Sequence, residues 1–140
     1  LKMIEEKLQK YFATQNDVAA VYLFGSYASG KQHPDSDADV AVLLAPYEPQ
    51  TEHVIRTRYM AELSRMTRMV IHPVILNSAG EALLKQVLKK GKCIQVNDPK
   101  ALSHFRMTAI VRIAEYGYYL PLFQRGVIRQ VMGGEHHGRS

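Results

Sequence analysis

The feature that most constrains this fold is a pair of short apolar runs on either side of a polar loop. The first run, 18–24, stops at Gly25-Ser26, and ten residues later Asp37-Ala38-Asp39 leads into the second run, 40–44. Short runs rich in β-branched or aromatic residues and bounded by Gly and Pro predict buried strands. Since the first run is apolar at every position, we expect its strand to be covered on both faces.

The two aspartates predict a metal site at the start of the second strand. Residues i and i+2 of a strand point to the same face, so Asp37 and Asp39 should project together. Two carboxylates held this close repel each other unless a cation lies between them. Mg²⁺ prefers oxygen ligands and usually binds one or two carboxylates together with substrate phosphates. At Gly25 and Ser26 the backbone can approach an anion closely, so the whole pattern is typical of a nucleotide site.

This pattern, Gly25-Ser26, ten residues and then Asp37-Ala38-Asp39, resembles the GSx10DxD signature of polymerase β-like nucleotidyltransferases. In size and layout the chain is most similar to the minimal nucleotidyltransferases (MNT), the antitoxin halves of HEPN–MNT toxin–antitoxin pairs. The resemblance covers residues 4–97. It implies an α+β fold, with a small mixed sheet flanked by helices and a C-terminal helical segment. It also implies that Asp37 and Asp39 are catalytic and hold Mg²⁺, while Gly25 and Ser26 bind the nucleotide. The bland alternative is that Gly25-Ser26 is only a turn and that the aspartates merely solubilise a strand end.

The third predicted strand departs from the family pattern. Members of the resembled family carry a third aspartate there, whereas the stretch 71–77 of this chain has His72 at that position. A neutral imidazole can accept a proton, and its reference pKa of about 6.5 suits that task. It is, however, a poor ligand for Mg²⁺, which prefers oxygen. His72 is therefore either a base or the mark of a degraded site, and both interpretations stay open.

The remaining pattern predicts helices that alternate with short strands. An apolar stripe at helical spacing predicts a first helix before residue 16, and Thr51 is expected to cap a helix that ends near residue 65. The third strand, 69–76, contains Pro73, which cannot donate to a sheet ladder and so places this strand at an edge or a bulge. A short fourth strand is expected at 93–96.

Two further helix starts have capping signals. Ser78 and Glu81 have the spacing of a capping box, and Asp98 with Pro99 has the form of a cap followed by the first helical position. We divide the chain into a nucleotidyltransferase domain at 1–98, a C-terminal helical segment at 99–132 and a flexible tail at 133–140 that includes His136 and His137. The apolar C-terminal segment either packs on the domain or lies at a partner interface.

Composition limits the possible partners. The formal net charge of +5 could attract nucleic acid, nucleotides or an acidic protein. The basic stretches 56–68 and 85–92 lack the interleaved aromatic platforms of single-strand binders, so we do not expect nucleic acid as a direct partner. No apolar run approaches the ~20 residues that cross a bilayer, and we expect no membrane association. The single cysteine, Cys93, fits a reducing compartment, which favours a cytoplasmic location.

Two functions remain. The resemblance implies an enzyme, a protein adenylyltransferase that moves AMP from ATP onto a hydroxyl, here a tyrosine of a partner HEPN ribonuclease toxin. The alternative is an inactive or weakly active binding module of the MNT fold that neutralises its toxin by forming a complex. The intact GSx10DxD pattern favours the enzyme, and His72 favours the binding module.

Overall fold

The computed structural model describes residues 2–25 and 38–115 of the 140-residue chain. The bounds of its elements are α1 Lys2–Ala13, β1 Val18–Phe24, β2 Ala38–Leu44, η1 Pro49–Thr51, α3 Glu52–Thr67, β3 Ile71–Ile75, η2 Leu76–Ser78, α4 Glu81–Lys90, β4 Lys92–Val96 and α5 Pro99–Ile113. Several expectations fall outside this part of the chain, namely those for Ser26, Asp37 and the segment beyond residue 115 with its tail at 133–140.

The strands of this part form one mixed sheet in the order β3-β2-β1-β4. β1 runs antiparallel to both β2 and β4, whereas β2 and β3 are parallel and are joined through α3. A parallel pair needs such a crossover, and a helix is its usual form. The predicted α+β fold with a small mixed sheet is confirmed, and Pro73 lies on an edge strand, as its missing N–H requires.

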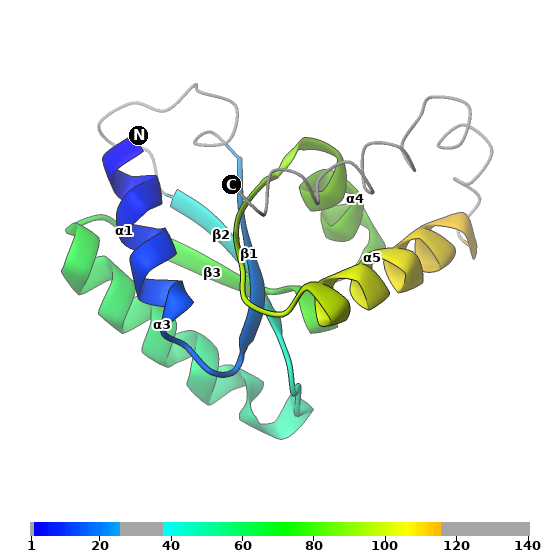
Figure 1. Ribbon diagram of the computed structural model, residues 1–140, viewed down its shortest axis with the longest axis horizontal. Helices are drawn as coiled ribbons and strands as arrows, with labels where there is room; N and C mark the ends of the chain where they lie inside the picture. Colours follow the sequence, from blue (N-terminus) through cyan, green and yellow to red (C-terminus); the bar gives the residue numbers. More distant parts are fainter. Residues whose placement is uncertain (1, 26–37, 116–140) are drawn as a thin grey trace.

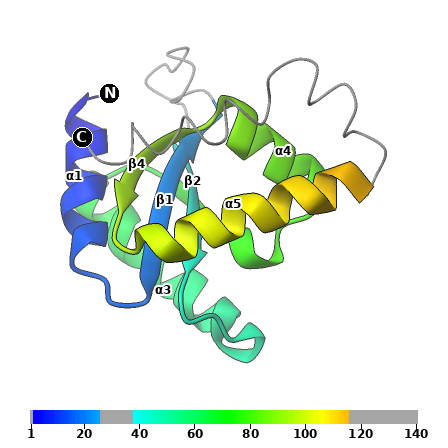
Figure 2. The same ribbon diagram turned by 45° about the vertical axis from the view of Figure 1, so that its right-hand side comes forward.

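Helices cover both faces of the sheet. Figure 1 shows α1 and α3 on one side and α4 and α5 on the other, and Figure 2 shows α5 crossing in front of β1. β1 is buried at every position, as its continuous apolar sequence predicts. Alternate residues of the strands therefore contribute to two separate cores, one beneath α1 and α3 and the other beneath α4 and α5.

The helix α5 belongs to the second core. Its buried residues include Leu102, Ala109 and Ile113, which pack over the face of β1 that carries Ala20 and Tyr22. Met107 and Val111 point away and are 51% and 54% exposed. The first part of the C-terminal segment is thus integral to the domain, while its outer side remains open. Among the described residues, no helix is both long and apolar enough to cross a bilayer.

The predicted helix caps have mixed outcomes. Asp98 caps α5, because its side chain accepts a hydrogen bond from the backbone N–H of Ala101 at 3.1 Å. The predicted capping box at Ser78 is wrong, since η2 holds Ser78 before the helix and Gly80 occupies the N-cap of α4. Thr51 occupies the N-cap of α3, but its hydroxyl donates to the Glu48 carbonyl at 3.0 Å instead of accepting from the helix.

Candidate functional site

The ends of three strands lie side by side at one end of the sheet. β1 ends there at Phe24, while β2 and β3 begin there. In the strand register, Asp39 lies opposite Phe24 on one side and beside His72 on the other. Neighbouring strands lie about 4.8 Å apart, so these three residues form a short row across the sheet edge. The structure thus brings the predicted Asp39 together with His72, the residue at the departing family position.

Gly25 lies against the carboxylate of Asp39. Its backbone has a φ of +75°, in the left-handed region that favours glycine. A Cβ atom placed on Gly25 would be 2.3 Å from Oδ2 of Asp39. Both the backbone conformation and the close approach therefore require a residue without a side chain. Gly25 and Asp39, which belong to the same sequence motif, are in contact in the fold. The other two residues of the motif, Ser26 and Asp37, lie outside the described residues.

His72 is placed by the turn that leads from α3 into β3. Arg68, in the left-handed conformation with a φ of 59°, ends the helix, and its N–H donates to the Ser64 carbonyl at 2.8 Å. Ile71 then packs into the core beneath α1 and α3, fully buried. Because strand residues alternate, His72 points to the opposite face, where it is exposed. His72 is therefore accessible beside Asp39.

A buried arginine of α5 is hydrogen-bonded to β1 close to these strand ends. Arg106 of α5 is only 1% exposed, and its Nε and Nη2 atoms donate to the hydroxyl of Tyr22 at 3.0 and 2.9 Å. Tyr22 shares a sheet face with Phe24, two residues along the strand. Cys93 of the neighbouring strand β4 pairs with Tyr22; burial raises the pKa of its thiol, and the charge of Arg106 opposes that rise. The sequence did not single out Arg106, because its helical pattern resembles that of any basic residue on a solvated face.

The donor chemistry at the edge fits a hard cation. The Asp39 carboxylate is partly exposed at the start of β2, and Gly25 contributes no side chain beside it. Mg²⁺ prefers oxygen ligands. It usually binds one or two protein carboxylates, and substrate phosphates complete its coordination. Within residues 2–25 and 38–115 no group of three or more His, Cys, Asp or Glu side chains is gathered as a metal cluster. Asp39 alone of the two predicted metal ligands lies within the described residues.

A glycine at the end of β1, packed on an aspartate of β2, agrees with the arrangement that the GSx10DxD resemblance implies. The model of the family described as "Polymerase beta, Nucleotidyltransferase" matches residues 6–100 of the chain. This match covers more than half of the sequence, and the chain belongs to that family. The resemblance predicted from the GSx10DxD spacing is confirmed.

Individual relatives include MNT antitoxins, the subgroup of the family that the sequence predicts. Over 72 residues the chain is 38% identical to the protein adenylyltransferase MntA of Shewanella oneidensis. That alignment covers 51% of this chain and 50% of the relative, so the match spans only half the length of the curated protein.

Solved structures extend the similarity to most of the chain. One, described as a toxin–antitoxin with AMP-PNP, has a TM-score of 0.65 and 29% identity over 91% of this chain and 98% of its own. Another, a tri-AMPylated Shewanella oneidensis HEPN toxin in complex with MNT antitoxin, gives a TM-score of 0.60 and 26% identity over 94% and 98% of the two chains.

Proposed function

We propose that this chain is a Mg²⁺-dependent nucleotidyltransferase that moves AMP from ATP onto a tyrosine hydroxyl of a HEPN toxin, and so acts as an antitoxin in the cytoplasm. The observation that carries the proposal is the contact between Gly25 and the Asp39 carboxylate at the edge where β1 ends and β2 begins. The relatives support the choice of nucleotide and partner, since their descriptions name AMP-PNP, an adenylyltransferase and an AMPylated HEPN toxin.

Each residue of the motif has a role in this proposal. Gly25 and Ser26 bring backbone N–H groups close to the phosphates, because no side chain intervenes at Gly25. Asp37 and Asp39 hold the metal, which when bound neutralises the phosphate charge that would otherwise repel the carboxylates. The tyrosine oxygen bonds to the α-phosphorus as the bond to the bridging oxygen breaks and pyrophosphate leaves. The tyrosine proton passes to a base.

The nucleotide site is tested by titration calorimetry with ATP, with and without Mg²⁺. We expect Asp37→Ala/Asp39→Ala to abolish the Mg²⁺-dependent part of ATP binding, because no carboxylate would remain between the metal and the strand edge. The matched control is Glu48→Ala/Glu52→Ala, which removes two carboxylates at the start of α3. A carboxylate variant that binds Mg-ATP as tightly as the wild type would show that the site is misassigned.

The exposed His72 beside Asp39 favours one second candidate, a binding module that silences its toxin without modifying it. An imidazole at the position of a third carboxylate weakens the metal site, because Mg²⁺ prefers oxygen. In that case the complex would form and inhibit the toxin while the toxin's mass stayed unchanged.

A further inference from the structure

The buried arginine of α5 lies on the same sheet face as the candidate nucleotide site. Arg106 is 1% exposed, and within residues 2–25 and 38–115 it is the one Lys, Arg, Asp or Glu side chain that is buried. Moving a charge out of water is costly, so an arginine at such a position calls for an explanation. The explanation that follows comes from where the charge lies.

Tyr22 fixes the position of the Arg106 guanidinium. Its hydroxyl accepts from both Nε and Nη2, at 3.0 and 2.9 Å, and its ring centre lies 5.9 Å from the central carbon of the guanidinium. Tyr22 is itself buried in the middle of the sheet, paired with Cys93 of β4. The positive charge is therefore held against β1, within the core beneath α4 and α5.

Tyr22 and Asp39 are diagonal neighbours on one face of the sheet. In the register of β1 and β2, Tyr22 lies opposite Ala41 and Phe24 lies opposite Asp39. Directly opposed residues share a face, and their diagonal neighbours lie about 7–8 Å apart. Because Tyr22, Phe24 and Ala41 all belong to the core beneath α4 and α5, Asp39 projects to that face as well. The charge of Arg106 thus lies one residue pair behind the Asp39 carboxylate.

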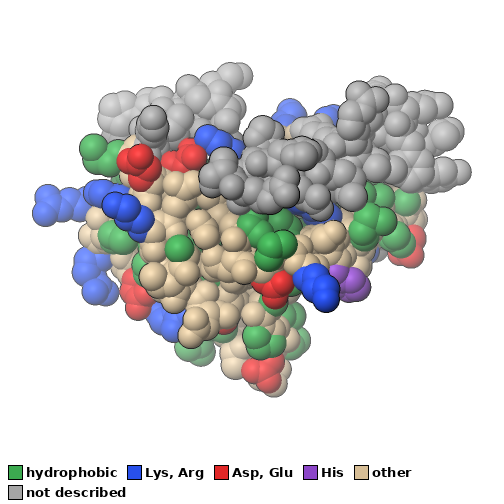
Figure 3. Space-filling model, in the orientation of Figure 1, with side chains coloured by type: hydrophobic (Ala, Val, Ile, Leu, Met, Phe, Trp, Pro, Cys, Tyr) green, Lys and Arg blue, Asp and Glu red, His purple; other side chains and the backbone are tan. Residues whose placement is uncertain are grey.

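A charge in this position acts strongly on an anion bound at Asp39. Exposed charges are screened by salt, whereas buried charges are screened much less. Figure 3 shows a group of Lys and Arg side chains over α1 and α3, but these helices cover the opposite face of the sheet. At about 10 Å and an effective dielectric constant of about 20, one unit charge changes a binding constant by roughly tenfold. Arg106 can therefore offset part of the repulsion between the carboxylate and a polyphosphate.

We propose that Arg106 is an electrostatic positioning residue of the nucleotide site: from the core, its guanidinium attracts the phosphates of Mg-ATP held at Asp39. The proposal rests on the proposed function, because it names a determinant of the same nucleotide site. It requires the positive charge of Arg106 and not only the hydrogen bonds that join α5 to β1. Charge and hydrogen bonds can be removed separately.

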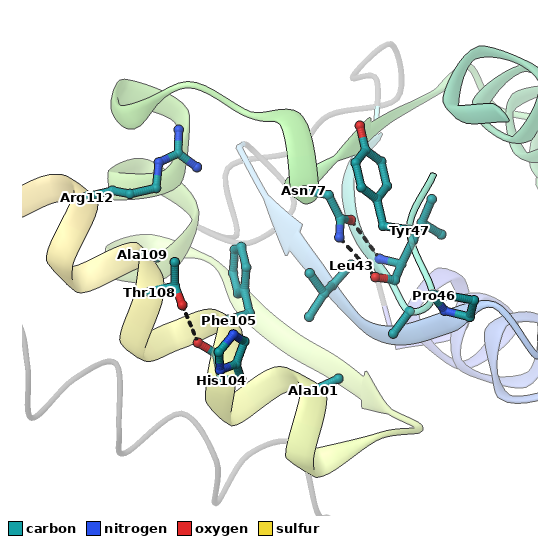
Figure 4. Close-up of a pocket in the computed structure, with 12 residues that line it drawn as sticks. Leu43, Pro46, Tyr47, Asn77, Ala101, His104, Phe105, Thr108, Ala109 and Arg112 are labelled. Atoms are coloured by element: carbon teal, nitrogen blue, oxygen red, sulfur yellow. Dashed lines mark hydrogen bonds between the residues drawn. The ribbon is translucent and has the colours of Figure 1, made fainter. Parts of the chain in front are cut away.

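The test compares two variants that break the same hydrogen bonds. Arg106→Gln removes the charge, whereas Tyr22→Phe removes the accepting hydroxyl and keeps the charge. The matched control is Arg112→Gln, which removes the same charge elsewhere on α5. Arg112 donates to Glu81 at 2.7 Å and lines a pocket beside Phe105 (Figure 4). For each full-length variant, Mg-ATP affinity is measured by titration calorimetry and the free energy of unfolding by urea denaturation.

We expect Arg106→Gln to weaken Mg-ATP binding by roughly tenfold. Tyr22→Phe should also lower the free energy of unfolding, but its loss of affinity should be clearly smaller because the guanidinium remains. Arg112→Gln should bind Mg-ATP as the wild type does. A loss of affinity that follows the loss of stability equally in Arg106→Gln and Tyr22→Phe would mean a purely structural pair and would overturn the proposal.

A second pair of variants decides the question if Arg106→Gln does not fold. Cys93 is buried beside Tyr22, and its thiol already responds to the charge of Arg106. Cys93→Asp sets a negative charge against Arg106, and the nearby guanidinium favours the ionised carboxylate. Cys93→Asn has the same size without the charge. We expect Cys93→Asp to bind Mg-ATP more weakly than Cys93→Asn, and equal affinities would count against the proposal.

The outcomes separate this proposal from the proposed function. Wild-type Mg-ATP affinity in Arg106→Gln would overturn the role of Arg106 and leave the nucleotide site standing. A wild-type chain that binds no Mg-ATP would refute the nucleotide site itself, and the role of Arg106 with it.

Discussion

Gly25 and Asp39 depend on each other at the scale of single residues. An alanine at position 25 would have to adopt a left-handed φ of +75°, and its Cβ would overlap Oδ2 of Asp39. The backbone strain alone costs about 1–2 kcal/mol, and the carboxylate would also have to move. We expect Gly25→Ala to lower Mg-ATP affinity by roughly tenfold or more, measured by titration calorimetry.

Gly80 provides the control for this substitution. It has no atom within 4 Å of the position that a Cβ would take. Its backbone is extended, with a φ of −76°, so Gly80→Ala should leave nucleotide affinity unchanged. Equal affinities for the wild type and Gly25→Ala would mean that the nucleotide does not use this end of β1.

His72 decides whether the departure from the family pattern matters for the reaction. If it acts as the base, His72→Ala should lower the transfer rate by about 10²-fold or more without changing Mg-ATP affinity. His72→Asp should keep or raise the rate, since a carboxylate beside Asp39 can accept a proton and hold the metal. His53 is another exposed histidine, on α3, and His53→Ala is the matched control. A His72→Ala variant with the wild-type rate would mean that His72 is not the base.

At the scale of elements, α5 is fixed to β1 through Arg106 and Tyr22. Tyr22→Phe would leave two buried N–H groups of a charged side chain without the hydroxyl that accepts them. We expect a loss of about 1–3 kcal/mol in the free energy of unfolding, measured by urea denaturation. Tyr47→Phe removes a hydroxyl at a less buried site and should cost clearly less. Equal losses in both variants would show that the buried hydrogen bonds between Arg106 and Tyr22 stabilise the fold no more than the Tyr47 hydrogen bond does.

The packing of α5 also changes how the C-terminal segment can be studied. Removing everything after Asp98 would take Leu102, Ala109 and Ile113 out of the core, so the domain itself would be destabilised. A loss of partner binding in that variant could come either from a lost interface or from the destabilised domain. Substitutions on the exposed side of α5 leave the core intact and therefore test partner binding more directly.

The sequence predicted the elements well where local chemistry decides them. The continuous apolar run of β1, the proline on the edge strand β3 and the Asp98 cap all follow from constraints within a few residues. The capping box at Ser78 failed because a tertiary partner, Glu52, takes the serine hydroxyl at 2.9 Å. The burial of Arg106 and the pocket beside Phe105 depend on packing between distant segments, which no local pattern encodes.

The same limit applies to the candidate site. Spacing alone placed Gly25 and Asp39 at the ends of neighbouring strands, and their register brought them into contact. The position of His72 beside Asp39 could be expected only from the family resemblance, because the pairing of β2 with β3 joins residues far apart in sequence. The left-handed Arg68 that turns the chain into β3 carries no sequence signal, since that conformation is uncommon for arginine.

In the whole molecule the proposed chemistry lies at one end of the sheet. The strand ends around Asp39 would handle the nucleotide. Transfer of this kind depends mainly on positioning and charge stabilisation, so docking should supply much of the rate.

The most direct test of the central claim is the intact mass of the HEPN protein after incubation with this chain, ATP and Mg²⁺. We predict that its mass rises by whole AMP units on a tyrosine. The mass should stay unchanged without Mg²⁺ and with Asp37→Ala/Asp39→Ala. A HEPN protein that is inhibited in the complex but keeps its original mass would contradict the account, and the chain would then silence its partner by occlusion alone.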